Sequence, residues 1–95
     1  MNSYRLSSNA KEDLKRIYFY GFENFGEQQA DLYYDEFFEA FERIAENPNL
    51  YPAIDNIRRG YRRCPCGSDS IYYRVQNDFV EIMAIIGGQE TNVWI

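Results

Sequence analysis

The 95 residues include 45% hydrophobic and 18% aromatic side chains, which predicts one folded domain over residues 1–95 and leaves no material for a second core. The formal net charge of −5 argues against a protein that wraps duplex nucleic acid, because that affinity comes mainly from neutralising phosphates. No apolar run is long enough to span a membrane, and no basic start precedes an apolar block. We therefore expect a cytoplasmic protein.

The chain begins with a predicted strand followed by a predicted helix. Ser3–Ser7 alternates apolar and polar side chains, which is typical of a short strand. Ser8 or Asn9 is the expected helix cap, since Asn9 and Glu12 have the spacing of a capping box. Apolar residues then recur at helical spacing to about Asn24.

A second helix is predicted over Glu27–Asn47. Gly26 separates it from the first helix by supplying a left-handed backbone, and Pro48 stops it. Because this connection is short, the two helices should pack antiparallel as a hairpin. The second helix has acids on one side and an apolar stripe on the other, and the stripe consists of Ala30, Tyr33, Tyr34, Phe37, Phe38, Phe41, Ile44 and Ala45.

Three strands are predicted in the second half of the chain. Asn49–Gly60 has no clean period and is typical of a loop. Tyr61–Cys66, Ile71–Val75 and Phe79–Ile86 have the composition of strands joined by turns. Pro65 indicates that the first of these strands lies at an edge. The nearly continuous apolar run of the last one predicts an interior strand with both faces covered.

These elements predict an α+β fold with the order β-α-α-β-β-β. The aromatic stripe of the second helix is too apolar to face water, so it needs a layer to pack against. A small, mainly antiparallel sheet is the only layer available. We therefore expect the helical hairpin to pack on one face of that sheet.

Two cysteines flank Pro65 in the predicted edge strand. Residues two apart in a strand point to the same side at a separation of about 6.5 Å, which is near the limit for a disulfide. The sequence has no histidine and no second cysteine pair, so Cys64 and Cys66 do not predict a metal site. We interpret them as two half-buried strand thiols, and we expect neither a metal nor a cofactor.

Five arginines lie between residues 58 and 74, a stretch that contains one acid, Asp69. Such a local patch suits a carboxylate-rich partner, because a guanidinium pairs with a carboxylate through two hydrogen bonds. A solvated basic face that balances the acidic helices is an equally good interpretation at this stage. The arginines are Arg58, Arg59, Arg62, Arg63 and Arg74.

The sequence contains no recognisable catalytic motif. The commonest general base at neutral pH is missing because there is no histidine. No serine stands in a nucleophile elbow, and no glycine-rich phosphate loop is present. Residue chemistry alone therefore favours a binding module over an enzyme, with no catalytic residues. The competing enzyme hypothesis gives a phosphate-binding role in RNA cleavage to Arg62, Arg63, Arg74, Tyr72 and Tyr73.

Several stretches together resemble the ParE branch of the RelE/ParE toxin superfamily. They are RLSSNAKEDLKRIYFY, NFGEQQADLYYDEFFEAFERIAENPNL, IRRGYRRCPCGSDSIYYRV and VEIMAIIG. Each motif is weak alone, but their order and the total length are fairly specific, and the resemblance covers nearly the whole chain. The fold of that family agrees with the architecture predicted from periodicity.

The resemblance implies the toxin of a bacterial type II toxin–antitoxin system, in complex with a cognate antitoxin that holds it inactive. ParE-like toxins are associated with poisoning DNA gyrase, whereas RelE-like toxins cleave messenger RNA on the ribosome with basic and aromatic or histidine side chains. The last predicted strand offers no histidine, arginine or tyrosine. The gyrase hypothesis is therefore favoured; a RelE-like endoribonuclease and a weakened toxin that only binds a partner are the alternatives.

The predicted binding residues follow from charge and shape. The five arginines are expected to contact acidic side chains of the antitoxin. An added helix should lie beside the hairpin against Phe19, Tyr20 or Phe22. The family links potency to the end of the chain, which predicts a target-directed segment that includes Gly87, Gly88, Gln89 and Trp94.

Overall fold

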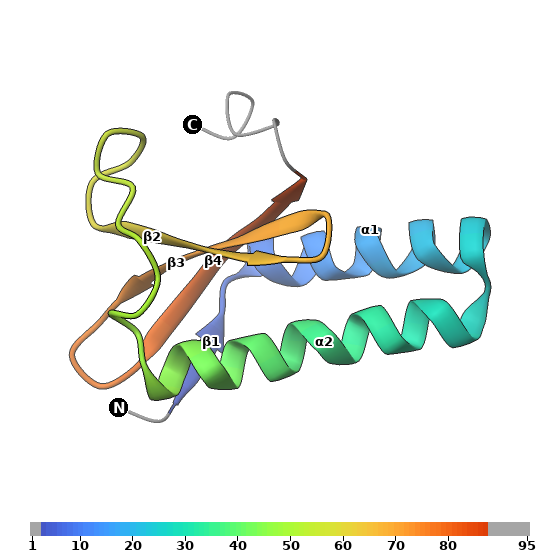
Figure 1. Ribbon diagram of the computed structural model, residues 1–95, viewed down its shortest axis with the longest axis horizontal. Helices are drawn as coiled ribbons and strands as arrows, with labels where there is room; N and C mark the ends of the chain where they lie inside the picture. Colours follow the sequence, from blue (N-terminus) through green and yellow to red (C-terminus); the bar gives the residue numbers. More distant parts are fainter. Residues whose placement is uncertain (1–2, 88–95) are drawn as a thin grey trace.

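The computed structural model describes residues 3–87, and it confirms the predicted order of helices and strands (Figure 1). A helical hairpin lies on one face of a four-stranded sheet. Within the described residues, neither helix combines the length and apolar character that a membrane crossing requires. The elements are β1 (Tyr4–Leu6), α1 (Ser8–Phe25), α2 (Glu27–Glu46), β2 (Tyr61–Cys66), β3 (Asp69–Val75) and β4 (Val80–Gly87).

The strand order in the sheet is β1-β4-β3-β2. β1 pairs parallel with β4, while β2, β3 and β4 form an antiparallel meander. The expected edge position of the strand that contains Pro65 is confirmed, since β2 has only β3 as a neighbour. β4 lies between β1 and β3, as its apolar run predicts.

The first helix is capped one residue earlier than predicted. Ser7 has an extended backbone, with φ −67° and ψ 163°, and its Oγ accepts a hydrogen bond of 3.0 Å from the Ala10 N–H. Ser8 and Asn9 are already helical, so the predicted cap at either residue is wrong, as is the capping box with Glu12. Ser7 also donates to the Met83 carbonyl at 2.9 Å, which ties the start of α1 to β4.

The main core lies between the hairpin and the sheet. Phe37, Phe41 and Ile44 of the α2 stripe are fully buried there, as predicted. They pack with Ala10, Leu14 and Ile17 of α1 and with Ile71, Tyr73, Val80, Ile82 and Ile85 of the sheet. Tyr34 differs from the prediction, because it lies at the rim and is exposed.

A second, smaller cluster covers the opposite face of the sheet. It contains Ile54 from the loop before β2, Tyr61, Tyr72, Ala84 and Ile86. Both faces of β4 are therefore covered, as its composition predicts. A bulge shifts the pairing between β3 and β4, because Tyr72 pairs with Ala84 and Tyr73 with Ile82. This shift lets both Ile82 and Ile85 enter the main core although they are three residues apart.

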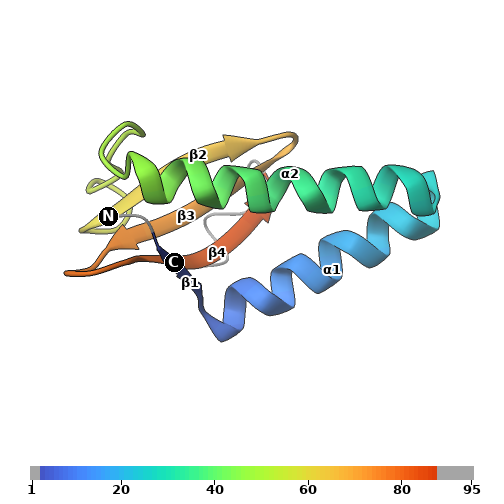
Figure 2. The same ribbon diagram turned by 90° about the horizontal axis from the view of Figure 1, so that it is seen from below.

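The hairpin is longer than the sheet that it covers. Figures 1 and 2 show the end of α1 and the start of α2 projecting past the strands, with Gly26 at the tip. Gly26 reverses the chain with a positive φ of 91°, as predicted for a glycine, but its ψ of 168° lies outside the left-handed helical conformation that was expected. We call the projecting part, residues 18–34, the overhang. Tyr33 is the overhang residue that reaches the sheet, through Cys66 and Asp69. The exposed rings of the overhang have the other helix as a neighbour but no strand beneath them.

Candidate partner-binding surfaces

The overhang exposes a group of large apolar side chains. Phe19, Tyr20 and Phe22, which the sequence analysis assigned to partner contact, are exposed by 58%, 64% and 46%. Phe25, Leu32 and Tyr34 join them. Phe25 follows the helical period of the buried residues, so periodicity gives no sign of its exposure. It is exposed because the sheet ends before the helix does.

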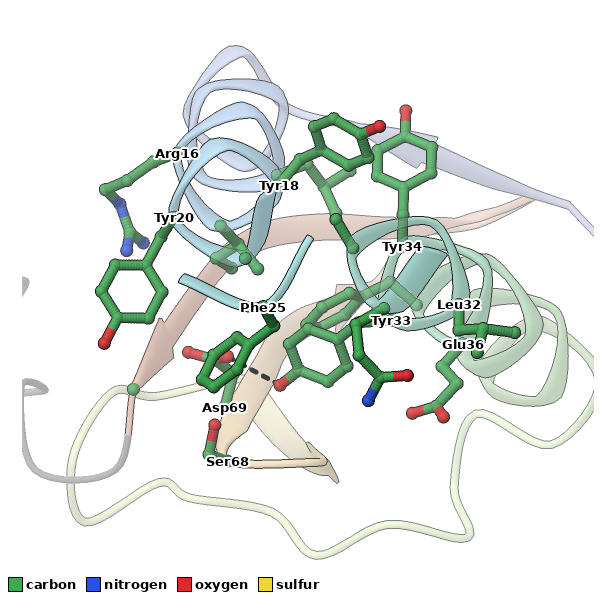
Figure 3. Close-up of a pocket in the computed structure, with 17 residues that line it drawn as sticks. Arg16, Tyr18, Tyr20, Phe25, Leu32, Tyr33, Tyr34, Glu36, Ser68 and Asp69 are labelled. Carbon is green, nitrogen blue, oxygen red and sulfur yellow. Dashed lines mark hydrogen bonds between the residues drawn. The ribbon is translucent and has the colours of Figure 1, made fainter. Parts of the chain in front are cut away.

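A pocket of about 510 Å³ lies where the overhang meets the β2–β3 turn. Figure 3 shows Phe25 and Tyr33 facing Ser68 in the β2–β3 turn and Asp69 at the start of β3, while Tyr18 and Tyr34 point to the other side of the hairpin. Aromatic and aliphatic side chains line the pocket together, and its polar groups include Arg16, Gln29, Glu36, Ser68 and Asp69. A pocket with an apolar wall and a few polar groups is suited to bind a side chain of a partner protein.

Tyr33 fixes the shape of this pocket by joining α2 to the β2–β3 turn. Its hydroxyl lies 2.7 Å from Asp69 Oδ2, to which it donates, and 3.0 Å from the Cys66 carbonyl oxygen. Burial, together with the hydrogen bond to Asp69, raises the pKa of Tyr33 to about 12. The ring lies against Gly67, where an added Cβ would collide with it. A glycine is required there for a second reason as well, because the backbone φ is 61°.

A second groove of about 480 Å³ runs along the other side of the hairpin. A chain of ring contacts follows it: Tyr18 lies 5.6 Å from Tyr34 between ring centroids, and Tyr34 lies 5.0 Å from Phe38. The Tyr18 hydroxyl donates to Asp31 at 2.7 Å, which links the two helices and raises the pKa of Tyr18. Lys11 and Lys15 also line this groove.

The five arginines do not form one surface. Arg62 shares its side of β2 with the core cysteines, and it donates to the Tyr51 carbonyl at 2.6 Å. Arg63 lies on the opposite side, where it donates to Ser70 Oγ at 2.9 Å. Arg74 lies on that same opposite side and pairs with Glu81 at 2.8 Å. Arg62, Arg63 and Arg74 therefore already have hydrogen bonds or an ion pair within the chain.

The other two arginines are exposed in the loop that precedes β2. Arg58 lies 5.1 Å from the centroid of the Tyr61 ring, within the range of a cation–π contact. Arg59 is its neighbour in the same turn. Partner contact by the arginines stays a prediction.

The residues named for phosphate binding do not converge. Tyr72 is 1% exposed and lies on the same side of the sheet as Arg63 and Arg74. Tyr73 and Arg62 lie on the helix side, where the Tyr73 hydroxyl donates to the Pro48 carbonyl at 2.6 Å. Burial raises the pKa of Tyr73. The sheet therefore separates these five groups into two sets.

Both cysteines are buried in the main core rather than half-buried as predicted. Burial raises the pKa of the Cys66 thiol to about 11, and it also raises that of Cys64. Thiols with raised pKa values are poor nucleophiles at neutral pH. Among residues 3–87, no three His, Cys, Asp or Glu side chains come close enough to hold a metal ion.

The end of the chain can be placed only in part. Gly87 is the last residue of β4, and it lines the pocket beside Asp69. Gly88, Gln89 and Trp94, the other members of the predicted target-directed segment, lie outside the described residues.

Comparisons with known proteins agree with this fold. A family model described as "ParE toxin of type II toxin-antitoxin system, parDE" matches residues 4–91. Toxin ParE1 of Caulobacter vibrioides is 44% identical over 75 residues, which cover 79% of this chain and 78% of that protein. Toxin ParE1 of Mycobacterium tuberculosis is 37% identical over 75 residues, which cover 79% and 76% of the two chains.

A solved structure gives independent support for the fold. It is described as a chromosomal ParDE TA system from P. aeruginosa, and its chain superposes with a TM-score of 0.82. The match covers 94% of this chain and 98% of that one at 20% sequence identity. At this identity the likeness supports the architecture alone.

Proposed function

The chain belongs to the family of ParE toxins of type II toxin–antitoxin systems, and we propose that it acts by binding and inhibiting DNA gyrase while a cognate ParD-like antitoxin holds it inactive. The observation that carries this proposal is the overhang. A 95-residue protein exposes Phe19, Tyr20, Phe22 and Phe25 at one end of a hairpin. Such a patch is typical of a protein-binding surface, because it gains little from contact with water.

The antitoxin is the proposed occupant of the overhang. An amphipathic helix laid beside the hairpin would cover the rings that the sheet leaves exposed. Its acidic side chains would meet Arg58 and Arg59, both of which are exposed. The functional unit is then a hetero-oligomer of toxin and antitoxin.

We propose that the protein has no catalytic activity of its own. The residues that a ribonuclease mechanism would use lie on two sides of the sheet, with Tyr73 and Arg62 on one side and Tyr72 and Arg74 on the other. General acid–base catalysis needs these groups within reach of one phosphate. A role in binding gyrase therefore agrees better with the placement of the described residues than RNA cleavage does.

A supercoiling assay with purified gyrase tests the proposal. The purified chain should inhibit supercoiling, and an equimolar amount of the cognate antitoxin should abolish that inhibition. Phe19→Ser with Phe22→Ser is the informative variant, because both side chains are exposed and their loss leaves the core intact. Glu39→Gln, an exposed change on another face, is the control.

Each outcome separates the alternatives. Antitoxin binding without any inhibition at soluble concentrations would reduce the function to partner binding. Cleavage of messenger RNA in a translating extract, abolished by Arg74→Ala, would instead establish the RelE-like ribonuclease.

A further inference from the structure

One side of the overhang meets the end of β4. Gly87, the last residue of β4, lines the pocket of about 510 Å³ together with residues of both helices. Three large apolar side chains of this pocket, Tyr20, Phe25 and Leu32, are more than half exposed. Figure 3 shows Tyr20 and Phe25 on the same side of the hairpin as Asp69, which pairs with Gly87 in the sheet. The chain therefore leaves the described part of the fold beside an uncovered apolar surface.

The sequence that follows β4 divides into a polar part and an apolar part. We call residues 88–95, which lie outside the described residues, the post-β4 segment. Its first five residues carry no large apolar side chain, and its last three are Val93, Trp94 and Ile95. Gly88 follows Gly87, and two consecutive glycines allow the chain a wide choice of direction after the strand. A short polar connection therefore joins an apolar cluster to the rim of the pocket.

The composition of this cluster matches the pocket. We propose that Val93, Trp94 and Ile95 dock into the pocket of the same chain, with the Trp94 ring against Phe25 and Leu32. An indole that packs against an aromatic ring gains from the ring contact in addition to apolar burial. The volume of the pocket lies in the range that accommodates a drug-sized ligand, so it has room for the indole and an aliphatic neighbour.

The connection is long enough to reach every part of the pocket. Trp94 follows Gly87 by seven residues, which span about 23 Å when extended. Along α1 the pocket runs from Leu14 to Phe25, a distance of about 17 Å at the rise of an α-helix. Gly87 itself lies at the pocket, so Trp94 reaches Phe25 without full extension of the segment.

Attachment to β4 favours this occupant over one that arrives from solution. A short connection holds the apolar residues near the pocket at an effective concentration of the order of millimolar. The segment also avoids the loss of translational and rotational freedom that separate molecules incur on association. Phe19 and Phe22 do not line this pocket, so they stay available to the antitoxin. The docking goes beyond the proposed function and does not rest on it.

Trp94 provides the test, because it is the one tryptophan of the sequence and its fluorescence reports on the segment alone. Acrylamide quenching of the full chain is compared with quenching of a synthetic peptide of residues 88–95. The Stern–Volmer constant should be about threefold or more lower in the full chain, because the tethered indole is docked most of the time. The emission of the full chain should also lie at a shorter wavelength than that of the peptide.

Phe25→Ser is the informative variant, because it removes an exposed ring of the pocket and leaves the core intact. It should bring the Stern–Volmer constant to within about twofold of the peptide value, since the docked fraction falls with the lost apolar contact. Leu32→Ser, on the other helix, should shift the constant in the same direction. Phe22→Ser is the matched control, since it makes the same change at an exposed position of α1 that does not line the pocket. It should leave the quenching unchanged.

Three outcomes overturn the proposal. The first is quenching of the full chain equal to that of the peptide. The second is protection of the indole that survives both Phe25→Ser and Leu32→Ser, because Trp94 is then buried elsewhere. The third is protection that is lost when the protein is diluted, since the pocket then belongs to a second copy. Gyrase and antitoxin are absent from these samples, so failure of the docking and failure of the proposed function are read separately.

Discussion

The sequence predicts partner binding at both the arginine-rich segment and the aromatic overhang, but the two regions differ in how their side chains are arranged in the structure. In the segment from residue 58 to residue 74, Arg62, Arg63 and Arg74 have partners within the chain, and they are divided between two faces of the sheet. In the overhang, six large apolar side chains stay exposed at one end of the hairpin. A run of charged residues along a strand therefore does not form one binding surface, because neighbouring side chains point to opposite faces of the sheet. An apolar helix that extends beyond the end of its sheet does form a binding surface.

The largest expected effect is the loss of stability when an aromatic ring of the core is removed, compared with removal of a ring of the overhang. Phe37→Ala should lower the free energy of unfolding by about 3–5 kcal/mol, because Phe37 is fully buried between the helices and the sheet. Phe22→Ala, on the overhang, should change it by less than about 0.5 kcal/mol. Urea unfolding measures both. Equal losses would mean that the overhang is packed in solution.

Gly67→Ala tests the junction between α2 and the β2–β3 turn. It should cost about 2–4 kcal/mol, since it adds a collision with Tyr33 to the strain of a positive φ. Gly60→Ala is the matched control, because φ is 83° there but the space around an added Cβ is open. It should cost about 1 kcal/mol. A cost no greater than that of the control would show that Tyr33 moves aside freely.

The affinity for the antitoxin, measured on variants of each candidate surface, shows which of the two surfaces the antitoxin contacts. Arg58→Glu with Arg59→Glu should weaken binding about tenfold at low salt and less at high salt, because these exposed arginines are the ones proposed to meet the acidic side chains of the antitoxin. Phe19→Ser with Phe22→Ser should weaken it to a similar extent at both salt concentrations, because apolar burial is not screened. Calorimetric titration at two salt concentrations measures the difference. Equal loss at both concentrations for the arginine variant would argue against a charge-driven contact.

The smallest expected effect is a fall in the free energy of unfolding at high pH that depends on Tyr33. Its folded pKa of about 12 lies above the ordinary value of 10.0, so the folded state holds the proton more tightly. The resulting stability is complete below pH 10 and is lost as the pH rises towards 12. Tyr33→Phe cannot ionise, so its unfolding free energy should decline less steeply over that range. Parallel slopes would show that Tyr33 ionises in the folded state as it does in a peptide.

Local signals account for the parts of the fold that were predicted correctly. The α2 stripe, the reversal at Gly26 and the edge position of Pro65 each depend on short-range spacing or on one residue's backbone. The cap of α1 was missed because Ser7, Ser8 and Asn9 are all good caps, and the hydrogen bonds of Ser7 to Ile82 and Met83 in β4 select among them. The burial of Cys64 and Cys66 was underestimated because it depends on how closely α2 covers an edge strand.

The sequence by itself determined which elements form, their order and the apolar sides that have to be covered, since these depend on residue spacing at periods of 3.6 and 2. Only the tertiary structure decided how far the sheet reaches beneath the hairpin, and so which aromatic rings are core and which are surface. Phe37 and Phe25 are the same residue type at helical positions, yet one is fully buried and the other is 67% exposed. The difference is whether a strand lies below them, and periodicity within a helix carries no information about that distance.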